Sequence, residues 1–185
     1  MEMNQSQRLP VPQQVAWEAL NDTELLKHCI PGCESIEPDG DNAYLLAMTA
    51  AVGPVKARFK GRMALEDIQA PDSYTLRFDG QGGPAGFGKG TARVRLEPDG
   101  DETVLSYTVD AHVGGKLAQI GSRLVDAAAR KMADTFFARF TEAVTPDSTQ
   151  DTPAAEGAPA AAAGDNEQTK EPKRKRSWTA WISKS

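Results

Sequence analysis

The chain has 185 residues and a formal net charge of −5 at pH 7, which is enough length for one medium-sized domain with an appendage. Its hydrophobic fraction of 39% and charged fraction of 25% are ordinary for a globular protein. The sequence contains no run of about 18 apolar residues, and its first residues, MEMNQSQRLPVP, lack the basic start and apolar core of a signal peptide. These features argue against a membrane-spanning helix and predict a cytosolic protein.

Charge is distributed unevenly along the chain. Residues 1–144 carry 15 basic and 20 acidic side chains, and residues 145–169 carry five acids and no base. Residues 170–185 carry six bases and one acid. A basic terminus therefore follows an acidic body, and it can act locally despite the overall negative charge.

The first part of the chain predicts a strand and two short helices. Residues 3–9 form a candidate strand, and Pro12 then opens the helical segment PQQVAWEALND, because proline at a first helical turn sacrifices no hydrogen bond. Asp22 is placed to cap a second helix, TELLKHCI, which Pro31 and Gly32 end.

A period of two then replaces the helical period. Apolar side chains alternate with polar ones over residues 44–52, 55–65, 74–79, 92–97 and 105–111. In the second of these segments the polar face is basic and comprises Lys56, Arg58, Lys60 and Arg62. The pattern predicts an antiparallel sheet with one face toward solvent and one toward the core.

A single long helix is expected to cover the inner face of this sheet. Apolar residues recur every three or four positions from Lys116 to about Ala143, and Gln119, Arg123, Asp126 and Arg130 lie opposite them. The predicted fold class is therefore α+β, a helix-grip architecture in which a curved antiparallel sheet wraps around a long C-terminal helix.

Small residues interrupt the inward-facing positions of the predicted sheet. They are Ala50, Ala57, Gly61, Gly80, Ala92 and Ala111, and Gly121 and Ala128 do the same on the helix. Two explanations are open. Small side chains allow helix and sheet to pack closely, or they leave a cavity lined by aromatic and aliphatic residues, as in sites for apolar ligands.

The segment QGGPAGFGKG, residues 81–90, contains five glycines and one phenylalanine. It lacks the spacing and the strand-to-helix context of a phosphate-binding loop. Two interpretations are open. The structural one is a flexible hairpin end, and the functional one is a gate with Phe87 as the lid residue.

Cysteines and histidines are too few to indicate a metal or catalytic site. Cys29 and Cys33 have a C-x3-C spacing around Pro-Gly, and the histidines are His28 and His112. Two reduced thiols near a helix end explain the pair better than a structural metal or a transient disulfide. No acid/base set converges on the predicted core, which argues against an enzyme.

The last 41 residues differ in character from the rest. Residues 145–169 contain no aromatic residue and predict a disordered Ala/Pro-rich linker. The terminal KRKRSWTAWISKS predicts a short amphipathic anchor with a basic collar, worth roughly 5–8 kcal/mol at an anionic membrane. Docking to a protein, a solvated tail or nucleic-acid binding are alternatives, and the last fits poorly because the rest of the chain is acidic. The anchor residues are Lys173, Arg174, Lys175, Arg176, Trp178, Trp181 and Ile182.

Four separated segments resemble the carbon monoxide dehydrogenase G-subunit family of the START-like (SRPBCC) helix-grip superfamily. They are CIPGCESIE, VGPVKARFKGRMAL, GFGKGTARVRL and VGGKLAQIGSRLV, and the resemblance covers residues 1 to about 144. It implies an accessory protein of a molybdenum-containing carbon monoxide dehydrogenase or related hydroxylase. It also implies attachment of that enzyme to the inner face of the cytoplasmic membrane, and binding of a respiratory quinone, menaquinone or ubiquinone.

The expected organisation is thus a helix-grip domain over residues 1–144, a linker over 145–169 and a membrane-binding tail over 170–185. Two further hypotheses are a ligand-free recruitment or assembly factor, docking through the basic strand face, and a small enzyme acting on an apolar substrate. Alternation and helix periodicity select the residues expected to line the ligand cavity: Tyr44, Phe59, Phe78, Phe87, Tyr107, Leu117, Ile120 and Leu124.

Overall fold

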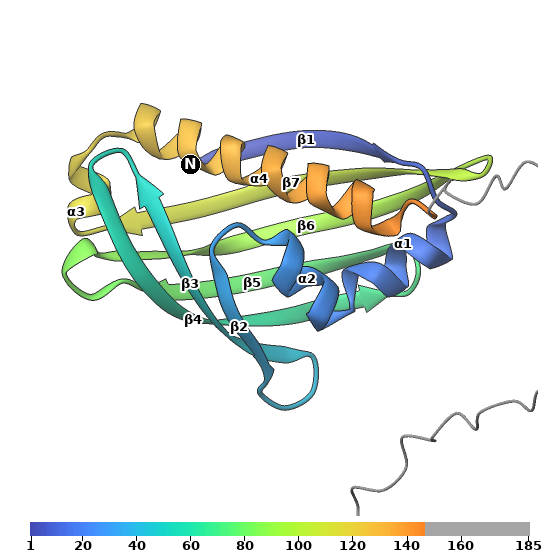
Figure 1. Ribbon diagram of the computed structural model, residues 1–185, viewed down its shortest axis with the longest axis horizontal. Coiled ribbons are helices and arrows are strands. Elements are labelled where there is room, and N and C mark those ends of the chain that lie inside the picture. The colour runs from blue at the N-terminus through green and yellow to red at the C-terminus, as the bar shows by residue number, and fades with distance from the viewer. Residues whose placement is uncertain (147–185) are drawn as a thin grey trace, which may run out of the picture. The chain divides into compact units, whose positions relative to one another are not determined.

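Residues 1–146 are described by the structure, a computed structural model (Figure 1). Nearly all of the predicted linker and the whole of the predicted tail lie outside the described residues. In chain order the elements are β1 (Glu2–Leu9), α1 (Gln13–Leu20), α2 (Thr23–Cys29), β2 (Cys33–Pro38), β3 (Ala43–Val52), β4 (Val55–Gln69), β5 (Ser73–Gln81), the 3-10 turn η1 (Gly83–Ala85), β6 (Phe87–Asp99), β7 (Glu102–Gly114), α3 (Lys116–Gln119) and α4 (Ser122–Val144).

The strands form one seven-stranded antiparallel sheet in the order β1-β7-β6-β5-β4-β3-β2. The first strand thus lies beside the last, and hairpin connections join β2 through β7. In Figure 1, β2 and β3 cross the direction of β6 and β7 steeply, so the sheet is strongly curved, and α1, α2 and α4 lie on one of its faces. The predicted α+β helix-grip fold is confirmed.

The two short helices begin and end as the sequence indicates. Pro12 occupies the N-cap of α1. The carboxylate of Asp22 accepts hydrogen bonds from the backbone N–H groups of Glu24 and Leu25, at 3.0 and 3.2 Å. Such a cap satisfies donors that the first turn of a helix leaves unpaired. Gly32 then has φ of +73°, and a Cβ there would overlap the backbone of Thr49, so only glycine fits this turn.

One strand has no counterpart among the elements predicted from the sequence. Strand β2 pairs with β3 through Ile36 opposite Leu46, and only Ile36 of its six residues is buried. A six-residue edge strand with one buried side chain and a terminal proline carries almost no alternation signal.

The predicted helix from Lys116 to about Ala143 is interrupted. It begins with the single turn of α3 and starts again at Ser122, because Gly121 has φ of +95°, a conformation that breaks the helix. The regular spacing of apolar residues runs through Gly121 without a gap, which is why the sequence pattern does not reveal the break.

Tight packing is concentrated where α1 and the C-terminal half of α4 meet strands β1, β6 and β7. Leu9, Leu96, Leu105 and Phe140 are at most 1% exposed there. Truncating such a side chain to alanine typically costs about 2–5 kcal/mol. This end of the molecule is the solid core, and Leu105 belongs both to it and to the wall of a cavity described below.

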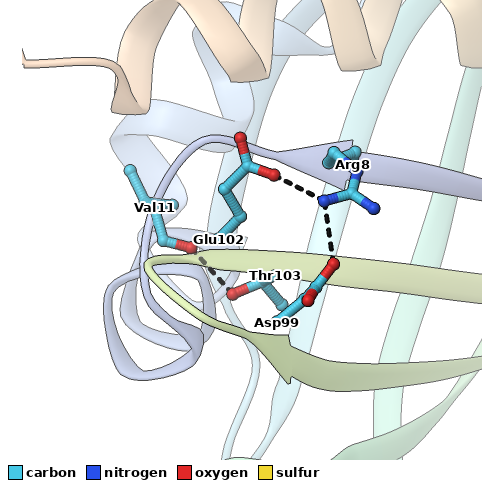
Figure 2. A network of polar contacts seen from close by, with 5 residues as sticks. All are labelled: Arg8, Val11, Asp99, Glu102 and Thr103. Atoms are coloured by element: carbon cyan, nitrogen blue, oxygen red, sulfur yellow. Dashed lines mark hydrogen bonds and ion pairs between the residues drawn. The ribbon is translucent and has the colours of Figure 1, made fainter.

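Polar contacts fasten β1 to the β6–β7 hairpin beside this core (Figure 2). The Arg8 guanidinium lies 2.8 Å from the Asp99 carboxylate and 2.6 Å from that of Glu102, and all three side chains are about half exposed. The two carboxylates raise the pKa of Arg8. Thr103, fully buried, donates a 2.8 Å hydrogen bond to the carbonyl oxygen of Val11. Among residues 1–146, no helix has the length and apolar character needed to cross a bilayer.

Candidate functional site

The first apolar cavity, called here the tyrosine cavity, lies between helices α1, α2 and α4 and the inner face of the sheet. Its volume is about 250 Å³. Leucine, isoleucine, valine, methionine and phenylalanine side chains supply most of its wall, and Asn21 and three tyrosines are the polar members. The residues lining it are Leu20, Asn21, Leu26, Ile30, Tyr44, Met63, Leu65, Tyr74, Leu76, Ala92, Val94, Leu105, Tyr107, Phe136 and Phe137.

A second apolar cavity, the phenylalanine cavity, continues along the same face of strands β3 to β6. It has a volume of about 270 Å³, and Phe59 and Phe78 are its aromatic residues. Leu117 of α3 and Met132 of α4 close it from the helix side. Met63 lines both cavities, so they adjoin at this side chain.

An open groove lies between β3 and α4, and is called the β3–α4 groove. It measures about 440 Å³, and among the residues lining it are Gly32, Ala51, Gly53 and Ala128. Ala50 and Met132 line both this groove and the phenylalanine cavity. The β3–α4 groove, the phenylalanine cavity and the tyrosine cavity therefore adjoin in this order, and methionines, which are flexible, lie at both shared walls.

Several of the small inward-facing residues line the two cavities instead of bringing the helix close to the sheet. Ala50, Gly61 and Gly80 line the phenylalanine cavity, and Ala92 lines the tyrosine cavity. Gly61 has a second role, because a Cβ there would overlap the backbone of Asp79 on the neighbouring strand. Of the two explanations that the sequence left open, the geometry favours a cavity.

Five of the eight residues expected to line a ligand site lie against these cavities. Tyr44 and Tyr107 line the tyrosine cavity, and Phe59, Phe78 and Leu117 line the phenylalanine cavity. They come from β3, β4, β5, β7 and α3, which shows how the alternation on each strand converges on one space.

The other three expected residues are placed elsewhere. Leu124 lines the outer β3–α4 groove and is 49% exposed, while Ile120 caps the C-terminal end of α3 and lines none of the three spaces. Phe87 lies on the opposite face of the sheet, where its ring is 6.2 Å from that of His112 and 5.9 Å from Lys89 Nζ. The inward residues of β6 are even-numbered, so extending that alternation back to position 87 predicts the outer face.

Glycines of the 81–90 segment make room for aromatic rings. A Cβ at Gly82 would overlap the ring of Phe59, and one at Gly90 would crowd Phe78. Ala85, in the η1 turn, is buried. Backbone hydrogen bonds join Gly82 N–H to the Gly86 carbonyl and Gly86 N–H to the Gly83 carbonyl, at 2.7 and 3.0 Å. Packing explains these glycines, and the expected lid residue does not face the cavity.

Burial governs the titration of the groups in and near the cavities. It raises the pKa of Tyr74, and it raises the pKa of Tyr107 together with the nearby Asp134 carboxylate. Burial also raises the pKa values of Cys29 and Cys33, which are both free thiols. Neutral forms are therefore favoured throughout this region.

Chemistry at the cavities is limited by their lining. No carboxylate, imidazole or amine lines the tyrosine cavity, and Arg62 and Asp79 are the charged residues that line the phenylalanine cavity. Within residues 1–146, no group of three or more His, Cys, Asp or Glu side chains is placed to hold a metal ion. One oxygen of Asp126, expected on the solvent side of the helix, is buried without a hydrogen-bond partner among the described residues. The arrangement suits binding of an apolar molecule.

A curved antiparallel sheet that encloses apolar cavities beneath a long helix defines the START-like class of ligand-binding folds. A conserved protein from Geobacillus kaustophilus is similar, with 32% identity and a TM-score of 0.74 over 78% of this chain and 95% of that one. A START superfamily protein from Mycobacterium smegmatis has 14% identity and a TM-score of 0.57 over 77% and 96%. The ZhuI aromatase/cyclase from Streptomyces sp. R1128 has 13% identity and a TM-score of 0.59 over 78% and 93%.

The model of the carbon monoxide dehydrogenase G-subunit (CoxG) family matches residues 6–145, and the chain belongs to this family. No match is found among the curated proteins. The family's name implies association with carbon monoxide dehydrogenase. Family and fold together indicate an accessory protein that binds a hydrophobic ligand, although one structural neighbour is named as a cyclase.

Proposed function

We propose that this protein binds a respiratory quinone, menaquinone or ubiquinone, in the tyrosine and phenylalanine cavities and connects a molybdenum-containing hydroxylase with the membrane electron-transport chain. The observation that carries this proposal is the succession of three adjoining spaces, the β3–α4 groove and the two cavities, which share Ala50, Met132 and Met63 as lining residues. Such a succession suits a ring with an attached chain better than a compact molecule. The hydroxylase is of the carbon monoxide dehydrogenase type, following the family.

The cavity walls offer an apolar ring an environment similar to the one it leaves in a bilayer. Both cavities are lined mainly by carbon, so the ring stays out of water in either place. Transfer from a membrane still requires the protein to meet the bilayer, because quinones with long chains are almost absent from water. The basic, tryptophan-containing tail supplies that contact in our proposal, on the inner face of the cytoplasmic membrane.

Loading from vesicles tests the ligand. Full-length protein is incubated with phosphatidylglycerol vesicles containing ubiquinone, recovered by size exclusion and extracted for quantification. We expect close to one quinone per chain, and a large decrease for Ala92→Phe, which fills the tyrosine cavity. Equal quinone recovery with Ala92→Phe, provided that the variant is folded, contradicts binding in this cavity.

Flotation with the same vesicles tests the tail independently. Arg174→Glu with Arg176→Glu is expected to abolish flotation of the full-length chain, whereas Arg93→Glu with Arg95→Glu, on the outer sheet face, is the charge-matched control. Binding should weaken as salt is raised, because the attraction is screened beyond about 10 Å at 0.1 M. Undiminished flotation of the tail variant rejects the membrane role of the tail.

A second candidate function is recruitment of the enzyme without a ligand. On the outer face of β4, Arg58 and Arg62 are paired with Glu34 and Asp39, at 2.6 Å each. Lys56 and Lys60 make no ion pair within residues 1–146, so they are available to an acidic protein surface. Co-purification of the hydroxylase with the Lys56→Glu, Lys60→Glu variant tests this face, and undiminished recovery of the enzyme would rule it out as the docking surface.

A further inference from the structure

Tyr74 is a buried phenol in the wall of the tyrosine cavity. It lies on the inner face of β5, and its side chain is only 8% exposed. The indole of Trp17, on α1, meets its ring edge to face, with centroids 5.6 Å apart and planes at 79°. The ring is thus held between helix α1 and the sheet, which fixes the position of the hydroxyl group.

The hydroxyl group of Tyr74 makes no hydrogen bond to any residue between 1 and 146. Tyr107, in the same cavity, differs in this respect, because its hydroxyl donates to Gln5 Oε1 at 2.7 Å. Tyr44 also lines the cavity without such a bond, but it is only partly buried and can reach water. Among the described residues, the fully buried side-chain atom without a partner is Asp126 Oδ1, so the unpaired Tyr74 hydroxyl keeps some accessible surface. A molecule bound in the cavity that Tyr74 lines can therefore accept its hydrogen bond.

The chemistry of a phenol in this setting is that of a donor. Desolvation raises its pKa, so it stays protonated at neutral pH and offers its O–H. A carbonyl oxygen on an otherwise apolar ring satisfies this donor and leaves the remaining carbon wall in apolar contact.

We propose that Tyr74 donates a hydrogen bond to a carbonyl oxygen of the ligand and thereby selects carbonyl-bearing rings over plain hydrocarbons. The inference rests on the proposed function, since it requires an apolar ligand in the tyrosine cavity. It also sets the ligand's direction: the ring lies beneath α1 and α2, and the chain passes Met63 toward the phenylalanine cavity and the groove.

Two probes with the same ring skeleton, one with carbonyl groups and one without, distinguish hydrogen bonding by Tyr74 from simple packing. They are 2,3-dimethyl-1,4-naphthoquinone and 2,3-dimethylnaphthalene, and the methyl groups prevent addition of the quinone to Cys33. Equilibrium dialysis with the full-length chain measures both affinities. Tyr74→Phe is expected to lower the affinity for the quinone about 3- to 10-fold, the usual effect of one neutral hydrogen bond, and to leave that for the hydrocarbon unchanged.

Tyr107→Phe is the matched control in the same cavity. Its hydroxyl is already bonded to Gln5, so its loss is expected to change both affinities by the same factor. If Tyr74→Phe lowers both affinities equally, or neither, the inference is overturned while the apolar site remains. If the wild-type chain binds neither probe, the proposed function is overturned and the inference with it.

Discussion

Thr103 donates a 2.8 Å hydrogen bond to the carbonyl oxygen of Val11, and this bond joins β7 to the segment between β1 and α1. Thr103 is the one polar side chain among the residues that are fully buried within the described part of the chain. Figure 2 shows it beside the Arg8 ion pairs, at the end of the molecule where the core is solid. The bond adds to the pairing of β1 with β7, which runs from Glu2 opposite Asp110 to Leu9 opposite Thr103.

Replacing Thr103 by valine keeps the shape of the side chain and removes the donor. The Val11 carbonyl group then stays buried without a partner, so we expect the free energy of unfolding to fall by about 1–3 kcal/mol. Urea denaturation measures this free energy for the wild type and the variant. Thr108→Val, at an exposed position on the same strand, is the control and should change stability by less than about 0.5 kcal/mol. Equal effects of the two substitutions contradict a structural role for the bond.

Tyr74→Phe should change the dependence of stability on pH. The folded state raises the pKa of Tyr74, so above about pH 10 the unfolded chain loses this proton while the folded chain keeps it. The folded chain then binds more protons, and the free energy of unfolding falls as pH rises.

In this range the wild type should lose about 1.4 kcal/mol more per pH unit than Tyr74→Phe. Urea denaturation between pH 8 and 11.5 measures both slopes, and the groups shared by the two chains cancel in the comparison. Below pH 9 the variant should be as stable as the wild type or more so, because no hydrogen bond is lost. If the free energies of unfolding of the two chains fall in parallel with pH, the Tyr74 hydroxyl is ionised equally in the folded and unfolded states.

The two cysteines should differ in reactivity. Cys29 is fully buried and Cys33 is partly exposed, and both are free thiols whose pKa values burial raises. At pH 8 we expect a disulfide reagent to modify one thiol in the folded chain and two in urea. Cys33→Ser should remove the reaction of the folded chain. Rapid labelling of two thiols without denaturant is incompatible with the buried position of Cys29.

Ala50 and Ala51 are neighbours on β3 that test the path between the groove and the cavities. Ala50 lines both the groove and the phenylalanine cavity, whereas Ala51 is exposed and lines the groove alone. Ala50→Phe should lower the affinity for a quinone with two isoprenoid units at least about 10-fold, because each buried CH₂ contributes roughly 0.8 kcal/mol.

The same substitution should leave binding of 2,3-dimethyl-1,4-naphthoquinone unchanged, since this ring needs only the tyrosine cavity. Ala51→Phe should leave both affinities unchanged. Overpacking at position 50 is expected to cost about 1–3 kcal/mol of stability, which thermal unfolding measures separately. Undiminished binding of the long quinone by Ala50→Phe would mean that its chain does not extend through this groove.

Much of the fold follows from periodicity. The alternation on β3 to β7, the Asp22 cap and the apolar stripe of α4 each arise from local rules that tertiary contacts then reinforce. Strand β2 and the break at Gly121 depend instead on pairing and backbone geometry, which leave little trace in the composition of those segments.

The candidate site is predictable from the sequence only in part. Alternation places Tyr44, Phe59 and Phe78 on the inner face, and their convergence then follows from the curvature of the sheet. Tyr74 shares that alternation, but its missing hydrogen bond becomes visible only when every neighbour is in place. Leu124 lies at the outer groove rather than in either cavity, because its part of α4 buries Val125, whereas Met132, Phe136 and Phe140 of the predicted stripe face inward.

The most direct test of the central claim is the content of the cavities in the protein as cells make it. Full-length protein purified without detergent is extracted with organic solvent, and the extract is identified by mass spectrometry. The account predicts a quinone in nearly equimolar amount, with a marked decrease for Ala92→Phe. An extract without quinone, unchanged after incubation with quinone-loaded vesicles, would contradict the account and favour recruitment of the enzyme without a ligand.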